Sequence, residues 1–122
     1  MKKILIVDDQ VSIATILGSI LKAGNFEIIN AVNGEAGIQK AKELKPDLII
    51  MDIMMPVKDG ITAIKELREM EDFKNIPIFI LSAKGGSHDT NLVEELGVCG
   101  LLKKPFSPGI ILAEVKKALG EL

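Results

Sequence analysis

The sequence is poor in cysteine, in long apolar runs and in net charge. Cys99 is the single cysteine among the 122 residues, which excludes an internal disulfide and suits a reducing compartment. No apolar run approaches the about 18 residues that a membrane span needs, and Met1-Lys2-Lys3 leads into a predicted strand rather than into a signal-peptide core. The net charge of −2 gives no reason to expect nucleic acid. We therefore expect a cytoplasmic protein without a membrane or a direct nucleic-acid partner.

The chain has enough apolar residues for one packed domain. Its length of 122 residues and its hydrophobic content of 48% argue against disorder. A chain of this size buries about 65% of its unfolded surface. No linker, low-complexity segment or block of like charge divides it. We expect a single domain over residues 1–122.

Apolar strand-like segments alternate with amphipathic helical segments along the whole chain. Continuously apolar runs, typical of strands covered on both faces, predict strands at Ile4–Asp8, Phe26–Asn30, Leu48–Met51, Ile76–Leu81 and Val98–Leu102. After the first strand, a helical stripe of core residues is predicted at Ile13, Ile16, Leu17, Ile20 and Leu21. Alternation of this kind predicts an α/β fold, a doubly wound (βα)5 arrangement with a five-stranded parallel sheet. Five units are too few for an eight-fold barrel.

Polar side chains stand where four of these predicted strands end, at Asp8, Asp9, Asp52, Ser82 and Lys104. Open parallel sheets bind ligands at the carboxyl ends of their strands. The second strand supplies no such group, as would follow if it lay at the edge of the sheet. Three neighbouring carboxylates repel one another and require a cation, and carboxylates with water suit Mg²⁺. With a hydroxyl and an ammonium to neutralise phosphoryl oxygens, the set predicts a site for one divalent metal and one phosphoryl group.

These residues also have simpler interpretations. Asp8 and Asp9 could merely cap the first helix, and Ser82 could be an ordinary turn hydroxyl. Lys103 is interpreted as a solvated surface charge. Residues outside the strand-end set are interpreted as ordinary packing, strand or loop groups: Met51, Met54, Met55, His88 and Cys99.

Five short motifs follow one another across the chain: Ile6-Val7-Asp8-Asp9, Met51-Asp52-Ile53-Met54-Met55-Pro56, Asp59-Gly60, Leu81-Ser82-Ala83-Lys84 and Lys104-Pro105-Phe106. Each motif is weak alone. Together, in order and spacing, they resemble the receiver domain of response regulators in two-component signal transduction. The resemblance covers the whole chain and implies a flavodoxin-like fold with strand order 2-1-3-4-5.

The resemblance implies a role for each acid. Asp52 resembles the phosphoacceptor, which takes a phosphoryl group from a sensor histidine kinase or a histidine phosphotransfer protein. Asp9, Asp52 and the backbone carbonyl of Met54 resemble direct Mg²⁺ ligands. Asp8 resembles the acid that holds the ion through water.

The resemblance also implies how the phosphoryl group is held and lost. Ser82 resembles the switch hydroxyl that bonds to the phosphoryl group, and Lys104 resembles the lysine that pairs with it. Such a domain catalyses its own phosphorylation and slow dephosphorylation but is not a turnover enzyme. Met54 and Lys84 occupy positions that influence the hydrolytic water, and they predict a long-lived phosphorylated state because neither is suited to activate that water.

Two partner surfaces are implied in the same way. The helical phosphotransfer partner would dock on the first helix and the loop after the fifth strand, through Val11, Ile13, Ala14, Thr15, Pro105 and Phe106. The fourth helix, fifth strand and fifth helix would form the output surface, including Leu92, Leu101 and Ile110. We expect this surface to bind an unidentified downstream protein or to form a weak phosphorylation-dependent dimer of an otherwise monomeric chain.

Several positions depart from the family pattern. Leu101 replaces the usual rotating aromatic switch, and the chain has no Tyr or Trp. Val57 and Lys58 replace a glycine and a hydrophobic residue. These departures concern the output surface rather than the phosphorylation site. The sequence ends at Leu122, after the last predicted helix, so we expect either a single-domain regulator or a piece cut from a larger one.

Three rival functions are consistent with parts of the pattern. A haloacid-dehalogenase-type phosphatase requires a second acid two residues after its nucleophile, where this chain has Met54. A chain of 122 residues also leaves no room for the cap or lid that would form a substrate pocket. A flavodoxin-like cofactor binder would need a phosphate loop after the first strand, where Asp8 and Asp9 would repel phosphate. A degenerate receiver acting as a scaffold is a further alternative, against which the intact acids argue.

Overall fold

The structure is a computed structural model of the chain, and it describes all residues except 54, 56–57, 83–86, 104–105 and 122; the side chains of residues 87–90 are also not described. The elements follow in the order β1 (Lys3–Val7), α1 (Val11–Lys22), β2 (Glu27–Ala31), α2 (Gly34–Leu44), β3 (Leu48–Asp52), α3 (Gly60–Arg68), η1 (Glu71–Phe73, a 3₁₀ turn), β4 (Ile78–Ser82), α4 (Ser87–Leu96), β5 (Gly100–Lys103) and α5 (Pro108–Ala118). The predicted alternation of strands and helices is therefore confirmed.

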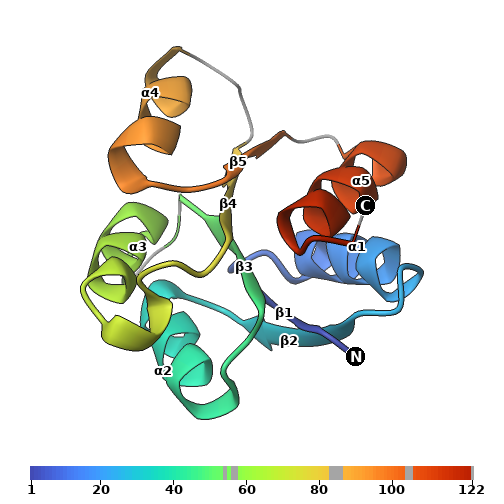
Figure 1. Ribbon diagram of the computed structural model, residues 1–122, viewed down its shortest axis with the longest axis horizontal. Coiled ribbons are helices and arrows are strands. Elements are labelled where there is room, and N and C mark those ends of the chain that lie inside the picture. Colours follow the sequence, from blue (N-terminus) through green and yellow to red (C-terminus); the bar gives the residue numbers. More distant parts are fainter. Residues whose placement is uncertain (54, 56–57, 83–86, 104–105, 122) are drawn as a thin grey trace.

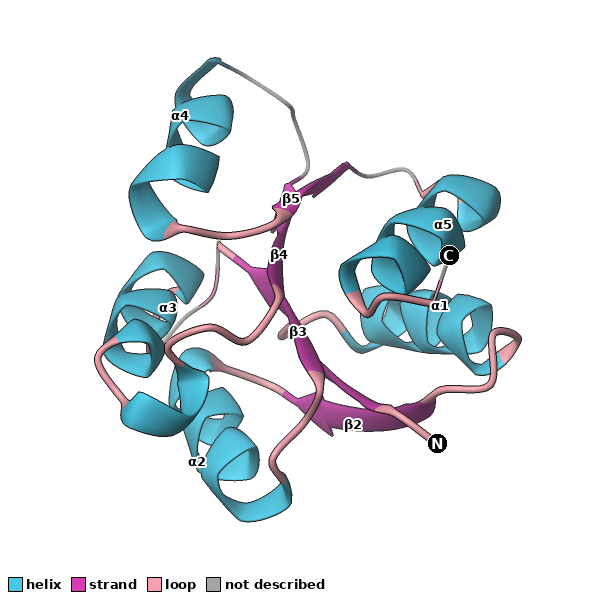
Figure 2. Cartoon of the chain, in the orientation of Figure 1, coloured by secondary structure: helices cyan, strands magenta, loops and turns pink. Residues whose placement is uncertain are grey.

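The described strands form one five-stranded sheet in the order β2-β1-β3-β4-β5, and every neighbouring pair is parallel. Figure 1 shows α1 and α5 on one face of this sheet and α2, α3 and α4 on the other. Viewed along its edge in Figure 2, the sheet forms the middle layer of three. The flavodoxin-like order and the edge position of β2 are as expected, and β1, β3 and β4 are the inner strands.

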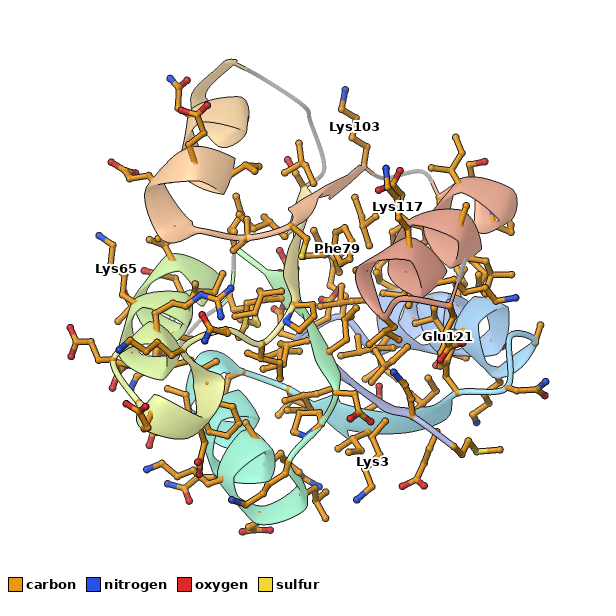
Figure 3. All side chains as sticks on the ribbon, viewed as in Figure 1. Lys3, Lys65, Phe79, Lys103, Lys117 and Glu121 are labelled. Atoms are coloured by element: carbon orange, nitrogen blue, oxygen red, sulfur yellow. The ribbon has the colours of Figure 1, made fainter. Side chains whose placement is uncertain are left out.

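The core consists of two apolar layers because successive residues of a strand point to opposite faces. Leu5 and Val7 face the layer under α2, α3 and α4, whereas Ile4 and Ile6 face the layer under α1 and α5. All four side chains are fully buried. The side-chain view in Figure 3 places Phe79 between the sheet and α5, within the second layer. Burial on both faces explains why the strands are continuously apolar.

Strand boundaries differ from the predicted ones by up to two residues. β1 ends at Val7, so Asp8 lies beyond it, and β4 begins at Ile78 rather than Ile76 and extends to Ser82. β5 starts at Gly100 rather than Val98 because the backbone amide of Val98 donates to the carbonyl of Val93 at 3.1 Å and closes α4 instead. Gly97 makes this helix end possible with a φ of 64°.

The predicted core stripe of α1 is only partly correct. Leu17 and Leu21 are fully buried, but Ile16 is 52% exposed. Ile13 and Ile20 are half-buried. Residues 13, 16 and 20 share a face at helical spacing. This face lies beside Phe106 and Pro108, in the segment that leads into α5, and not beneath α5 itself. The sequence pattern could not show how far α5 covers α1.

Arg68, near the end of α3, joins three backbone segments. Its Nη1 donates to the carbonyls of Phe73 at 2.9 Å and Ile76 at 2.8 Å, and its Nη2 donates to the carbonyl of Gly97 at 2.8 Å. Burial lowers the pKa of the guanidinium group from its ordinary value. This one side chain therefore links the connection before β4 to the end of α4.

Within the described part of the chain, no helix combines the length and the apolar character that crossing a membrane requires.

Candidate functional site

The sheet brings three carboxyl groups together at one edge. Val7 of β1 and Met51 of β3 are partners in the parallel register, so the next residues, Asp8 and Asp52, leave neighbouring strands at the same level. Carboxylate oxygens of Asp8, Asp9 and Asp52 all lie within 4.8 Å of one another. Asp8 is 2% and Asp52 is 5% exposed, while Asp9 is exposed. The structure therefore assembles the acidic cluster expected from the strand ends.

Asp8 shapes the turn between β1 and α1. Its amide donates to the carbonyl of Ala31 at 3.0 Å, which continues the pairing with β2 for one residue. Its Oδ1 accepts a hydrogen bond from the amide of Gln10 at 2.9 Å. The N-cap of α1 is Gln10, so neither Asp8 nor Asp9 occupies the cap position itself, and Asp8 bonds to the amide of the cap residue.

The hydroxyl-bearing strand end lies next to Asp52. Leu81 pairs with Asp52, and Ser82 follows it at the end of β4 with 4% exposure. On the other side Ser82 pairs with Lys103 of β5. The side chain of Lys103 is exposed and projects away from the sheet in Figure 3. Two further predicted site groups, Lys104 and the Met54 carbonyl, lie outside the described residues, as do Pro105 and Lys84.

The loop from Asp52 to α3 is closed at its base by Gly60. A Cβ atom on Gly60 would overlap the Asp52 carbonyl oxygen, so only glycine permits this approach. The amide of Gly60 donates to the carbonyl of Ile53 at 3.4 Å. Asp59 caps α3, since its side chain accepts from the amide of Thr62 at 2.8 Å. The Asp59-Gly60 turn thus fixes where the chain leaves the phosphoacceptor candidate and where α3 begins.

The acidic cluster has the donor set of a magnesium site. Oxygen ligands of one Mg²⁺ lie about 2.0–2.1 Å from the ion, so their mutual distances are about 3–4 Å. The carboxylate oxygens of the three acids lie within 4.8 Å of one another, near enough for one ion to bind among them. Two of the acids are almost fully buried, where like charges at short range are costly without a counter-ion. The residues present therefore fit a hard divalent cation.

Several other residues can now be placed. Met51 is fully buried and Met55 packs against the core, which confirms the packing interpretation for both. Cys99 is exposed. The side chain of His88 is not described. Lys58, noted in the sequence only as a departure, forms ion pairs with Glu35 and Glu66; no local pattern could have revealed them, because the acids belong to α2 and α3.

Comparison with known proteins identifies the class. The family model of the response regulator receiver domain matches residues 4–116, and the chain therefore belongs to that family. It is 43% identical over 118 residues to the alkaline phosphatase synthesis transcriptional regulatory protein PhoP of Bacillus subtilis, covering 97% of this chain and 48% of PhoP. It is 40% identical over 119 residues to ResD of the same organism, covering 96% and 48%. The chain thus spans about half the length of the curated relatives it matches.

Solved structures agree with this assignment. A putative response regulator from Chloroflexus aurantiacus superposes with a TM-score of 0.93 at 33% identity, covering 98% of each chain. The receiver domain of the sensor histidine kinase PA1611 from Pseudomonas aeruginosa superposes with a TM-score of 0.89 at 26% identity, covering 98% of each chain. That structure holds a magnesium ion coordinated in its active-site cleft. Because the chain belongs to the receiver family, the phosphatase and cofactor-binder alternatives are no longer supported.

The close contact between Gly60 and the Asp52 carbonyl can be tested by mutation. Gly60→Ala places a methyl group against the Asp52 carbonyl, so the end of β3 or the start of α3 has to move. We expect a loss of about 1–3 kcal/mol in the free energy of unfolding, the cost typical of overpacking, measured by urea denaturation.

Gly109→Ala is the matched control, because a Cβ atom at Gly109 would meet nothing within 4 Å. Alanine in that helix should leave stability unchanged or raise it by about 0.5–1 kcal/mol. Equal stability of the Gly60 variant and the wild type would refute the contact at the base of the loop.

Proposed function

We propose that this chain is a phosphorylation-dependent signalling switch in which Asp52 accepts a phosphoryl group from a phosphohistidine. The observation that carries the proposal is the meeting of Asp8, Asp9 and Asp52 at the carboxyl edge of the sheet. Asp52 ends an inner strand, and the other two carboxylates lie close to it. An incoming phosphoryl group is anionic, so these acids would repel it unless a cation is bound among them.

The chain's own residues supply the metal ligands. Asp9 and Asp52 would hold Mg²⁺ directly together with the Met54 carbonyl, and Asp8 would hold it through water. When bound, the ion would neutralise the acids and the phosphoryl oxygens. The magnesium-containing PA1611 receiver structure supports this proposal by analogy.

The transfer itself is a displacement at phosphorus. A carboxylate oxygen of Asp52 forms the new O–P bond while the N–P bond of the phosphohistidine breaks and its electron pair returns to the imidazole. Ser82, buried at the neighbouring strand end, would donate its hydroxyl to a phosphoryl oxygen, a charge-assisted hydrogen bond. Lys104 would pair with the same group. The chain thus performs phosphorylation and slow dephosphorylation of itself and is not a turnover enzyme.

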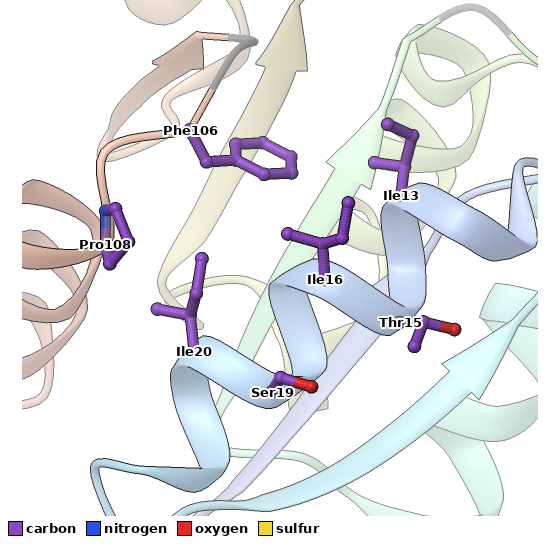
Figure 4. A pocket seen from close by; sticks show the side chains of 7 residues that line it. All are labelled: Ile13, Thr15, Ile16, Ser19, Ile20, Phe106 and Pro108. Atoms are coloured by element: carbon purple, nitrogen blue, oxygen red, sulfur yellow. The ribbon is translucent and has the colours of Figure 1, made fainter.

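An apolar groove beside the site suits a helical phosphodonor. The groove of about 470 Å³ is lined by Ile13, Thr15, Ile16, Ser19, Ile20, Phe106 and Pro108. Figure 4 shows the isoleucines of α1 and the ring of Phe106 converging on it. Ile13 lies in the first turn of α1, four residues after Asp9, so one end of the groove is near the acids, which favours a sensor histidine kinase or a histidine phosphotransfer protein as the partner. Val11, at 70% exposure, extends the apolar surface along α1.

The output surface is proposed on β5 and α5. Ile110 is 62% exposed and Leu101 is half-buried, and both line a second hollow with Lys103 and Glu114. Leu92, predicted to belong to this surface, is only 5% exposed because α4 turns it into the core; that part of the prediction is wrong. Binding of a downstream protein, or a weak phosphorylation-dependent dimer, would use the exposed residues.

The proposed chemistry is tested by labelling with acetyl phosphate. Wild type should be phosphorylated in Mg²⁺ and not after chelation of the metal, because the acids then repel the donor. Asp52→Asn should remove labelling. Asp47→Asn is the control, since Asp47 is exposed at the other end of β3 and accepts from the Lys3 amide at 2.7 Å.

Labelling of the Asp52→Asn variant at the wild-type level would refute the phosphoacceptor assignment. If the wild type is not labelled at all, the result would instead favour the alternative in which the chain is a degenerate receiver that acts as a scaffold.

The docking groove gives a separate test. Ile16→Arg introduces a charge into the groove without disturbing buried packing, so phosphotransfer from a cognate protein donor should slow by about tenfold, as for a central interface residue. Labelling by acetyl phosphate, which needs no docking, should stay at the wild-type rate. Leu44→Arg is the control, because Leu44 is 39% exposed at the end of α2. Equal loss with both donors would mean that the site itself had been damaged.

A further inference from the structure

Lys58 connects three parts of the fold through its side chain. Its Nζ lies 2.8 Å from Glu35 Oε2, in the first turn of α2, and 2.5 Å from Glu66 Oε2 on α3. The Lys58 side chain is only 20% exposed, whereas those of Glu35 and Glu66 are 52% and 42% exposed. A cation held between two acids on separate helices is a cross-link, and here it lies in the loop that leaves Asp52.

The backbone of Lys58 is attached to α2 independently. The amide of Gly34, the first residue of α2, donates to the Lys58 carbonyl at 3.2 Å. A Cβ atom at Gly34 would lie 2.5 Å from that carbonyl oxygen. The approach of the two backbones is therefore as close as a glycine allows. The loop after Asp52 is therefore held at both ends. The contact between Gly60 and Asp52 holds its start, and the hydrogen bond from Gly34 to Lys58 holds it near its end.

The three charges support one another. Hydrogen bonds to Glu35 and then to Glu66 raise the pKa of the Lys58 ammonium. The hydrogen bond from Lys58 lowers the pKa of Glu35. Both shifts favour the charged forms, so the ion pairs persist at neutral pH.

We infer that Lys58 is a positioning residue for the proposed Mg²⁺ site, because its ion pairs to Glu35 and Glu66 hold the loop that follows Asp52. This inference rests on the proposed function. Gly60, two residues after Lys58, packs against the carbonyl of Asp52 and links this end of the loop to the proposed ligand. Restraint of the loop by α2 and α3 reduces the conformational freedom that is lost when the ion binds. A residue of this kind acts through other groups and touches neither the ion nor the phosphoryl group.

A restraint of the loop and a direct charge effect of Lys58 predict opposite changes in Mg²⁺ binding when the ammonium is removed. An ammonium in the same loop repels a second cation, so removal of its charge alone would tighten Mg²⁺ binding. Removal of a restraint would weaken it. The direction of the change therefore distinguishes a positioning residue from a nearby charge.

The decisive variant is Lys58→Met, which keeps most of the side-chain length and removes the ammonium. We expect the dissociation constant for Mg²⁺, measured by amide chemical shifts of the unphosphorylated protein, to rise about 2- to 5-fold, the range for a partly exposed ion-pair network. Lys58→Arg should restore binding to near the wild-type value, because it keeps the charge. Lys65→Met is the matched control: it removes an exposed lysine of α3 that makes no ion pair with a described residue.

A metal-free readout accompanies the titration. Hydrogen exchange of the Gly34 amide should be faster in Lys58→Met than in wild type and unchanged in Lys65→Met, because only the first variant loosens the contact with the Lys58 carbonyl. A Mg²⁺ dissociation constant that is unchanged or lower in Lys58→Met would overturn the inference while leaving the proposed function intact. Failure of the wild type itself to bind Mg²⁺ at the three acids would overturn both.

Discussion

Three carboxyl groups meet at the carboxyl edge of the sheet, and holding them close together against their mutual repulsion is the main task of the surrounding fold. Asp8 and Asp52 are almost fully buried and share their surroundings with Asp9. Carboxylates placed this close together repel one another when charged, and a bound cation relieves that repulsion. The proposed ligands, one hard metal ion and one anionic phosphoryl group, suit this set of carboxylates.

The fold holds these charges in place from both sides. Fully apolar strands buried in two layers fix the level at which β1 and β3 end, and the parallel register aligns Asp8 with Asp52. Gly60 closes the loop that follows Asp52, and Lys58 joins that loop to α2 and α3. The strands thus position Asp8 and Asp52, and the contacts of Gly60 and Lys58 hold the end of the loop that follows Asp52. This division is common in enzymes and switches, where functional groups on loops depend on a rigid scaffold.

Much of this arrangement could be predicted from the sequence, because the strong signals are local. Runs such as Ile4–Val7 followed by two acids identify both a buried strand and the end at which the acidic cluster lies. Features that depend on distant neighbours could not be predicted in this way. The exposure of Ile16 depends on where α5 lies, the true start of β5 depends on how α4 ends, and the ion pairs of Lys58 join residues from two helices. The burial of Leu92 likewise follows from the orientation of α4 rather than from any local pattern.

If the three acids need a cation before Asp52 can hold a phosphoryl group, a phosphoryl mimic should bind only together with the metal. Amide chemical shifts can be followed with Mg²⁺ and beryllium fluoride, such a mimic, added separately and together. Beryllium fluoride should perturb Asp52 and Ser82 only in the presence of Mg²⁺, and the changes should then extend to Leu101 and Ile110 on the proposed output surface. Equal perturbation of Asp52 by beryllium fluoride without the metal would show that no cation is needed.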